Sequence, residues 1–229
     1  MKAKGNLLIT AGLLLIAAAL CLFGYNMYLT KSAGDSANAT IQAMQTLISS
    51  EDPTKVWQAQ LEQAAQEAVA DEERAAHSGF SAGEITIPDY VLDPTRDMPG
   101  ALIDEKEYVG YISVPVLGLN LPVLSEWSYE NLRIAPCRYV GTAYQPGFVI
   151  AAHNYTTHFG TLKTLVPGAQ VFYTDMDGNE FAYEVAEVDI LQPTAVEDMI
   201  SKDWDLTLFT CTVGGASRVT VRCLRAAQP

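Results

Sequence analysis

The chain has 229 residues, 27 of them acidic and 14 basic, so its formal net charge is −13 at pH 7. A surface this acidic repels phosphate backbones, which argues against nucleic acid as a partner. The hydrophobic fraction of 49% is typical of a globular protein and excludes a chain that is disordered as a whole. This length accommodates one sizeable domain with accessory segments rather than two full domains.

The chain contains four cysteines, Cys21, Cys137, Cys211 and Cys223. They form no C-x-x-C pair and have no histidine at zinc-like spacing, so we expect neither a metal site nor a cofactor. Four cysteines are also too few for a disulfide framework in a chain of this length. Separate buried thiols are the favoured interpretation, and a Cys137–Cys223 bridge stays an alternative.

The first predicted element is a membrane span from Leu7 to Leu29. These 23 residues carry no charge, and a helix of that length crosses a hydrocarbon core of roughly 30 Å. Lys2 and Lys4 precede the span and Lys31 follows it, which favours an N-terminus inside the cell. The rest of the chain then lies outside.

A cleavable signal peptide is the alternative to a retained anchor. Residues 37–39 read Ala-Asn-Ala, a small-x-small pattern that suits a signal peptidase. The apolar run is longer than an ordinary signal sequence, and the pattern lies well beyond its end. The retained anchor is therefore preferred, and both readings place the remainder outside the cytoplasm.

Between the anchor and the main domain we expect a stalk and a linker. Residues 32–39 are small and polar and indicate a flexible exit. Residues 40–77 are rich in Ala, Gln and Glu, and Pro53 after Asp52 is a good helix start, so this stretch predicts a helical spacer, with a partner-binding helix as the alternative. Residues 78–99 are dense in Pro and Gly and read as a linker with one edge strand over 84–87.

The pattern becomes strand-like from Ala101 onward. Short apolar runs recur with turn residues between them, and an Asp-Gly turn within residues 176–179 joins two runs as a hairpin. Short helices are predicted over 128–134 and 195–201. Several short strands with little helix predict a mainly β fold, a closed or nearly closed β-barrel. The chain thus divides into an anchor (1–31), a stalk and linker (32–100) and a β domain (101–229).

A cysteine and an arginine are predicted to meet across a tight hairpin. The strand-like run 206–211 ends in Cys211, and a glycine-containing turn leads to a second strand that opens with Arg218. Antiparallel closure brings the two together. A guanidinium favours the reactive thiolate and can donate hydrogen bonds to a developing oxyanion. Arg222 shares the strand face but lies roughly 13 Å farther along, so Arg218 is the preferred partner.

A histidine is the remaining candidate for proton transfer. His77 ends the acidic stalk, and we expect it to be solvated. His153 directly follows the apolar run 148–152, and a histidine at the mouth of a buried strand is held rigidly, as proton transfer requires. His158 lies in a polar loop and is either a substrate contact or simply exposed.

The run 207–211, Thr-Leu-Phe-Thr-Cys, resembles the T-L-x-T-C signature of bacterial sortases. The chain order also fits that family, with an anchor, a stalk and a barrel in which His153 precedes Cys211 and Arg218. Further similar stretches bring the resemblance to about residues 101–225, more than half of the chain; they are Gly110–Pro115, Leu121–Val123 and Gly147–Leu165.

The resemblance implies a sortase-like closed β-barrel and a membrane-anchored cysteine transpeptidase. In such an enzyme Cys211 attacks a backbone carbonyl in an LPxTG-like sorting motif of a surface protein and forms a thioacyl-enzyme. His153 protonates the leaving amine and then deprotonates the incoming one, while Arg218 binds the oxyanion. The implied acceptor is an amine of a cell-wall precursor or of a pilin lysine. Three further residues are expected to contact substrate: Thr210, Asn154 and His158.

Some features leave the subclass and the reaction open. The turn between Cys211 and Arg218 is short, so the long insertion of some sortase classes is absent, and no calcium-binding residues can be matched. A hydrolytic cysteine peptidase shares the nucleophile and the base, although papain-like enzymes place Cys before His. A non-catalytic extracellular β-barrel that binds a partner is the alternative from another class, with Cys211 as a packed thiol.

Overall fold

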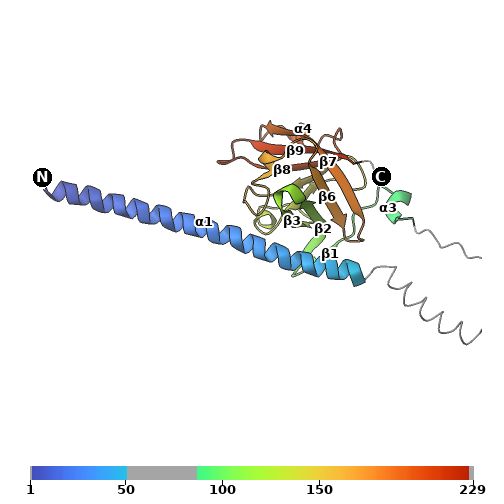
Figure 1. Ribbon diagram of the computed structural model, residues 1–229, viewed down its shortest axis with the longest axis horizontal. Coiled ribbons are helices and arrows are strands. Elements are labelled where there is room, and N and C mark those ends of the chain that lie inside the picture. Colours follow the sequence, from blue (N-terminus) through green and yellow to red (C-terminus); the bar gives the residue numbers. More distant parts are fainter. Residues whose placement is uncertain (1, 51–86, 227–229) are drawn as a thin grey trace, which may run out of the picture.

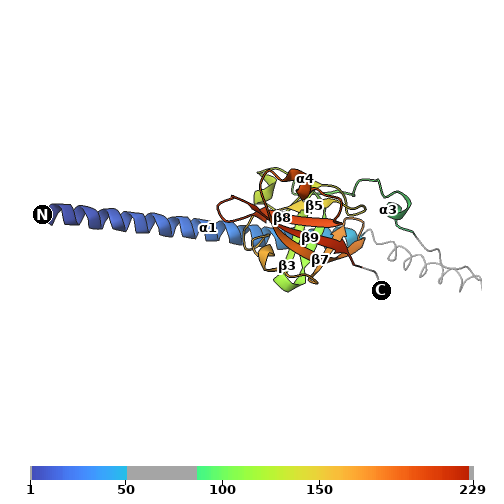
Figure 2. The ribbon, with the colours of Figure 1, turned by 90° about the horizontal axis from the view of Figure 1, so that it is seen from above.

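The computed structural model describes residues 2–50 and 87–226, and in the first range only the backbone is described for residues 2–11, 26, 29–30, 32–35 and 50. Helix α1 (Lys2–Ser50) is one continuous helix of 49 residues. Its N-terminal part projects away from the barrel, and its C-terminal part lies beside it (Figures 1 and 2). The predicted flexible exit over residues 32–39 is wrong, because these residues continue the helix.

Among the described residues, no helix has both the length and the apolar character that crossing a bilayer requires. The anchor expected over residues 7–29 therefore stays a prediction. The proposed helical stretch from Pro53 to His77 lies outside the described residues, as do residues 84–86 of the expected edge strand.

Nine strands form one sheet in the order β1-β2-β3-β4-β5-β8-β9-β7-β6. Strand β6 also pairs with β2, so β2 to β9 close into a barrel and β1 is an edge strand (Figure 1). This confirms the predicted β-barrel. The strands are β1 (Ala101–Ile103), β2 (Lys106–Val114), β3 (Leu119–Leu124), β4 (Cys137–Val140), β5 (Phe148–Ala151), β6 (Gln170–Asp175), β7 (Glu180–Leu191), β8 (Leu206–Cys211) and β9 (Arg218–Arg225).

Two of the pairings are parallel, β3 with β4 and β5 with β8, and the others are antiparallel. The β6–β7 hairpin closes as predicted, with Thr174 opposite Glu180. Its turn requires Gly178, whose φ of 83° lies in the left-handed region that disfavours side chains. The parallel β5–β8 pair matters most for function, because both strands end at the same edge of the barrel.

Apolar side chains alternate inward along the strands and fill the barrel. In β7, Phe181, Tyr183 and Val185 are buried while the residues between them are more exposed. In β8 four of the six residues are buried, because other segments cover its outer face as well. The interior includes Phe148, Ile150, Tyr173, Leu206, Leu208 and Val221, none exposed by more than a trace.

Helix α1 packs on the outside of this barrel. Ala37, Ile41 and Met44 are buried, and Met44 has no exposed surface. Met44 belongs to a second apolar cluster that also contains Leu124 of β3 and Ala151 of β5. The end of α1 is thus part of the barrel's packing, whereas the sequence suggested that residues near 40–50 begin a plain spacer.

Short helices fill the connections. They are α3 (Asp89–Leu92), η1 (Pro115–Leu117), η2 (Asn131–Arg133), η3 (Leu162–Thr164) and α4 (Val196–Met199). The elements η2 and α4 confirm the short helices expected over 128–134 and 195–201. Helix α3 lies where only a linker was expected, and the segment around it is attached to the barrel, since Tyr90 stacks on Tyr144 at 4.9 Å.

Candidate active site

The ends of β5 and β8 hold His153 next to the strand of Cys211. Ala151 lies opposite Phe209 in the parallel pair. One residue farther, the Ala152 amide donates to the Phe209 carbonyl at 3.1 Å, and Thr210 Oγ1 donates to the Ala152 carbonyl at 2.8 Å. Thr210 is 3% exposed, so its hydroxyl serves to fix the backbone that precedes His153.

Cys211 and Arg218 are direct partners across the β8–β9 hairpin, as the sequence predicted. The connecting turn is closed by the Thr212 amide, which donates to the Ser217 carbonyl at 2.9 Å. Gly214 and Gly215 supply the positive φ values, 83° and 75°, that the turn needs. Arg218 Nη1 donates to the carbonyls of Gly215 and Ser217, both at 3.1 Å, which holds the guanidinium at the hairpin tip.

All three predicted residues line one cavity of about 250 Å³, here called the Cys211 cavity. His153 enters from the end of β5, Cys211 from β8 and Arg218 from β9, and Cys211 is only half-buried. Thr210 lies in the same lining. The other lining residues are mostly apolar: Trp127, Tyr129, Leu132, Tyr139, Ala151, Ala152, Pro193, Ala195, Val196, Met199 and Phe209. A cavity of this kind suits an apolar peptide segment presented to a thiol.

One wall of the Cys211 cavity is aromatic and was missed from the sequence. Tyr139 packs edge-on against Phe209 at 5.3 Å, and Trp127 packs edge-on against Tyr139 at 5.9 Å. Tyr129 stands beside them and is 74% exposed. The signal in the sequence was the pair Trp127 and Tyr129 in a polar loop, where large aromatic side chains need a reason to be exposed.

The part of the lining that α4 contributes is held by Arg222. This arginine is 3% exposed, and its Nη2 donates to the Asp198 carbonyl at 2.7 Å while Nη1 donates to Thr207 Oγ1 at 3.1 Å. Burial lowers the pKa of Arg222, and the nearby carboxylates of Asp189 and Glu187 oppose that effect. Arg222 therefore fastens α4, whose Val196 and Met199 line the cavity, and does not itself reach the cavity.

The two neighbouring histidines have different surroundings. His153 is half-buried, and desolvation, followed by the positive charge of Arg133, lowers its pKa below the ordinary value of 6.5. His158 has no exposed surface, and neither ring nitrogen has a hydrogen-bond partner among the described residues. Burial, with a smaller contribution from His153, lowers the pKa of His158 to about 4. Both rings contact Tyr155, at 4.9 Å for His153 and 5.4 Å for His158.

The predicted substrate contacts at Asn154 and His158 do not line the Cys211 cavity. The loop that carries them turns back tightly, and the Phe159 amide donates to the His153 carbonyl at 3.1 Å. A Cβ at Gly160 would lie 2.5 Å from the Asn154 carbonyl oxygen, so only glycine permits this turn. The turn carries His158 into the core, so the alternative that this residue is simply exposed is wrong, while its contact with substrate stays a prediction.

Two of the other three cysteines are buried in the fold, and the third, Cys21, is exposed on α1. Cys137 and Cys223 are buried free thiols, and burial raises the pKa of each to about 12. No group of three or more His, Cys, Asp or Glu side chains in the described part of the chain is arranged to hold a metal ion. The chemistry available in the Cys211 cavity is that of a thiol, an imidazole and a guanidinium.

Comparisons with known proteins place this site in a family. The family model described as the sortase domain matches residues 112–226. Sortase A of Bacillus anthracis is 30% identical over 123 residues, covering 50% of this chain and 57% of that protein, so the chain spans somewhat more than half of the relative's length. A sortase D5 transpeptidase of Clostridium perfringens is 20% identical over 52% of this chain and 79% of its own, with a TM-score of 0.48. Sortase C1 of Streptococcus agalactiae is 24% identical over 56% and 72%, with a TM-score of 0.47.

Proposed function

This chain belongs to the sortase family, since the family model covers half of its length, and we propose that it is a cysteine transpeptidase. Its first substrate is a surface protein that carries an LPxTG-like sorting motif. Its second is an amine, supplied by a cell-wall precursor or a pilin lysine. The supporting observation is that Cys211 of β8, Arg218 of β9 and His153, two residues after β5, line one cavity.

In the first half-reaction His153 acts on the Cys211 thiol. The lowered pKa of His153 makes the neutral imidazole its resting form at pH 7, so it can accept the thiol proton. The thiolate then attacks the motif's carbonyl carbon, and the C–O π electrons move to oxygen. As the oxyanion collapses, the C–N bond breaks, the imidazolium gives its proton to the leaving amine, and a thioester to Cys211 remains.

Arg218 stabilises the oxyanion in both half-reactions. Its Nη1 is occupied by the turn carbonyls, and Nε and Nη2 make no hydrogen bond with a described residue. Arg218 is the backbone partner of Cys211 across the hairpin. Fixed donors aimed at developing charge account for much of the rate of acyl transfer.

In the second half-reaction the amine replaces the leaving group. Neutral His153 removes a proton from the incoming amine as its nitrogen attacks the thioester carbonyl. The C–S bond then breaks, and the thiolate leaves and recovers its proton from the imidazolium. The net result is that the amide bond of the sorting motif is broken and an amide bond to the acceptor amine is formed, without a cofactor.

We further propose that this chemistry takes place at the cell surface. Residues 1–31 comprise a cytoplasmic tip and a membrane anchor over Leu7–Leu29, with the N-terminus inside. The expected stalk and linker span residues 32–100, within which Ala37, Ile41 and Met44 pack on the barrel, and the catalytic barrel over residues 101–229 lies outside. The support is the uncharged run of 23 residues with lysines concentrated before it.

Mass spectrometry of the full chain with a panel of sorting peptides tests the proposal. Wild type should acquire an acyl adduct on Cys211, release the C-terminal fragment and yield an amide product when an amine is added. Cys211→Ala should do none of these. Retention of transfer by Cys211→Ala removes the mechanism, and release of free acid alone at saturating amine identifies a hydrolytic peptidase instead.

A further inference from the structure

The imidazole of His153 has no hydrogen-bonded group to orient it. The backbone around it is fixed, because the Ala152 amide donates to the Phe209 carbonyl at 3.1 Å. The Phe159 amide likewise donates to the His153 carbonyl at 3.1 Å. Neither ring nitrogen of His153, however, makes a hydrogen bond with a described residue. A base that activates a nucleophile is ordinarily oriented by a third group, so the two rotatable bonds of this side chain need another constraint.

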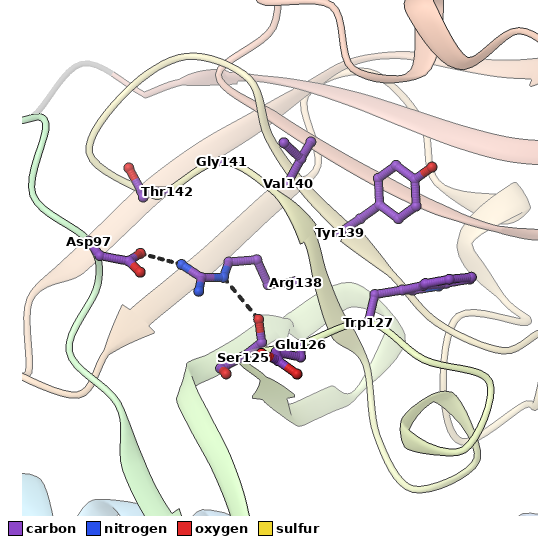
Figure 3. A pocket seen from close by; sticks show the side chains of 9 residues that line it. All are labelled: Asp97, Ser125, Glu126, Trp127, Arg138, Tyr139, Val140, Gly141 and Thr142. Carbon is purple, nitrogen blue, oxygen red and sulfur yellow. Dashed lines mark hydrogen bonds and ion pairs between the residues drawn. The ribbon is translucent and has the colours of Figure 1, made fainter.

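No carboxylate supplies that constraint. None of the described residues that line the Cys211 cavity is acidic. The loop after β3 carries Glu126, but this residue lines a different hollow of about 550 Å³, in which Asp97 is paired with Arg138 (Figure 3). The contact that remains for the imidazole of His153 is an aromatic one, made within its own loop.

The ring of Tyr155 lies against the ring of His153. The two centroids are 4.9 Å apart, and the planes are inclined to each other by 36°. Tyr155 is half-buried and does not line the Cys211 cavity, so its ring contacts the imidazole without taking space from a substrate. This contact restricts the rotation of the imidazole about its two side-chain bonds.

A buried imidazole in turn supports Tyr155. His158 has no exposed surface, and its ring centroid lies 5.4 Å from that of Tyr155. The Tyr155 carbonyl accepts hydrogen bonds from the amides of His158, at 3.0 Å, and Gly160, at 2.9 Å. A Cβ at Gly160 would lie 2.7 Å from that carbonyl oxygen, so the tight loop depends on glycine there. Tyr155 is therefore held by its backbone and by its ring.

The charges around His153 disfavour its protonated form. The charged and titratable groups near it are Arg133, Arg218, Cys211 and His158. Desolvation, followed by the positive charge of Arg133, lowers the pKa of His153. Burial lowers the pKa of His158 to about 4, so His158 stays neutral and adds no second charge. The proposed reaction nevertheless requires His153 to carry a proton twice in each cycle.

An aromatic ring offsets part of this cost. The negative face of a tyrosine ring attracts a cation that lies within about 6 Å of the ring centroid. The ring of His153 meets that condition at Tyr155. The same contact that restricts the imidazole can therefore stabilise its positive charge.

We propose that Tyr155 is a positioning residue for His153, whose ring fixes the plane of the imidazole and stabilises the imidazolium formed in each half-reaction. This inference rests on the proposed function, in which His153 carries the proton. Tyr155 then does with its ring what a hydrogen-bonded carboxylate does for the histidine of a catalytic triad. No bond forms or breaks at Tyr155.

An NMR titration tests the proposal without turnover. In Cys211→Ala, the Cε1–H resonance of His153, assigned with His153→Gln, reports the pKa of this imidazole. Tyr155→Leu should lower that pKa by about 0.5, the shift expected when one ring–cation contact is lost. Tyr155→Phe keeps the ring and should keep the pKa near that of the parent protein. Thr156→Ala changes an exposed neighbour in the same loop and is the matched control.

The direction of the shift separates this role from simple packing. If Tyr155 only fills space, its loss admits water, and the pKa of His153 rises toward the ordinary value of 6.5, because desolvation is what lowers it. A rise, or no change, in Tyr155→Leu overturns the proposal. Should Tyr155→Leu fail to fold, fluorinated phenylalanines at position 155 keep the ring's shape and weaken its negative face. The pKa of His153 should then fall as fluorines are added, and a constant value overturns the proposal.

Kinetics in the active protein measure the consequence for the reaction. With a sorting peptide as donor and triglycine as the amine, Tyr155→Leu should lower kcat about tenfold, because a misplaced imidazole slows both proton transfers. The KM for the sorting peptide should change less than about twofold, since Tyr155 does not line the cavity. Tyr155→Phe should restore most of kcat. A raised KM with unchanged kcat in Tyr155→Leu overturns the proposal. If even wild type transfers no acyl group while the pKa of His153 still responds to Tyr155, the transpeptidase assignment fails and the ring contact stands.

Discussion

The rim of the barrel and its interior contain the same three reactive residue types in different states. The rim, at the Cys211 cavity, has a half-buried thiol, an imidazole and a guanidinium. Within a few residues of each along the chain or across the hairpin lies a buried counterpart. The pairs are Cys211 with Cys223, Arg218 with Arg222, and His153 with His158.

This comparison shows that position in the fold, rather than residue type, decides whether a thiol, an imidazole or a guanidinium lines the Cys211 cavity. Cys211 and Arg218 pair at the open tip of β8–β9, whereas Cys223 pairs with Leu206 at the covered base. Burial raises the pKa of the Cys223 thiol at this base, and burial in the loop after β5 lowers the pKa of the His158 imidazole. Each pair can be tested by asking whether its two members respond differently.

The largest difference should be that between the alkylation rates of Cys211 and Cys223. Burial raises the pKa of Cys223 to about 12, so only about 10⁻⁴ of these thiols are ionised at pH 8, and the side chain has no exposed surface. We expect iodoacetamide to alkylate Cys211 at least about 10³-fold faster than Cys223 in the native protein. Peptide-level mass spectrometry measures both rates in one sample.

Unfolding provides the control for the alkylation experiment. In concentrated guanidinium chloride Cys137, Cys211 and Cys223 should react at similar rates, because burial no longer distinguishes them. Comparable rates in the native protein would mean that the hairpin base opens readily, and the contrast between tip and base would then have no chemical consequence.

Substitution of Arg218 should affect catalysis, and substitution of Arg222 should affect stability. Arg218→Met should lower kcat/KM about 10²-fold, the usual loss for one oxyanion donor, with little change in stability because the side chain lies at the tip. Arg222→Met removes the guanidinium that donates to the carbonyls of Asp198 and Met199 and to Thr207 Oγ1. It should lower the free energy of unfolding by about 1–3 kcal/mol and raise KM for the sorting peptide as the α4 wall loosens.

Steady-state kinetics and denaturant melts on the same preparations measure the two effects. Arg218→Lys keeps the charge but not the planar fork, so it should recover only part of the lost rate. If Arg222→Met were to lose kcat with an unchanged KM, Arg222 would be acting on the transition state, and the assignment of roles along β9 would be reversed.

Much of this arrangement could be predicted from the sequence because it depends on short-range geometry. A cysteine and an arginine six residues apart around a glycine turn meet in any antiparallel closure. Strand periodicity likewise indicated a barrel. The parallel β5–β8 pair, which brings His153 to the same edge, came from the resemblance and not from any local pattern, because its strands are separated by two others in the chain.

What the sequence could not provide is which distant segments cover which face. The alternation along β9 placed Arg222 on the face of Arg218, but the covering of that face by α4 depends on a segment some 25 residues away. The packing of Met44 on the barrel is a contact between parts of the chain that no periodicity links. Polar neighbours made the loop around His158 look exposed, although Gly160 turns it into the core.

The histidines offer the last test, a pH dependence of stability that depends on burial. The folded-state pKa of His158 is about 4, below the ordinary value of 6.5, so the unfolded chain binds the proton more tightly. The contribution of His158 to the unfolding free energy should therefore be at its maximum above pH 6.5. It should decrease by about 2–4 kcal/mol as the pH is lowered toward 4. His158→Phe, which keeps a flat ring in the core, should lose this pH-dependent part of the unfolding free energy. His153→Phe should lose less of that pH dependence and should abolish transfer.

Urea titrations from pH 4 to 8 give the difference in unfolding free energy between wild type and each variant, which removes the contribution of the carboxylates common to all. If the unfolding free energy has the same slope against pH in wild type and in His158→Phe, His158 is not buried as a neutral ring. The pKa values of the imidazoles at the rim and in the interior would then not differ.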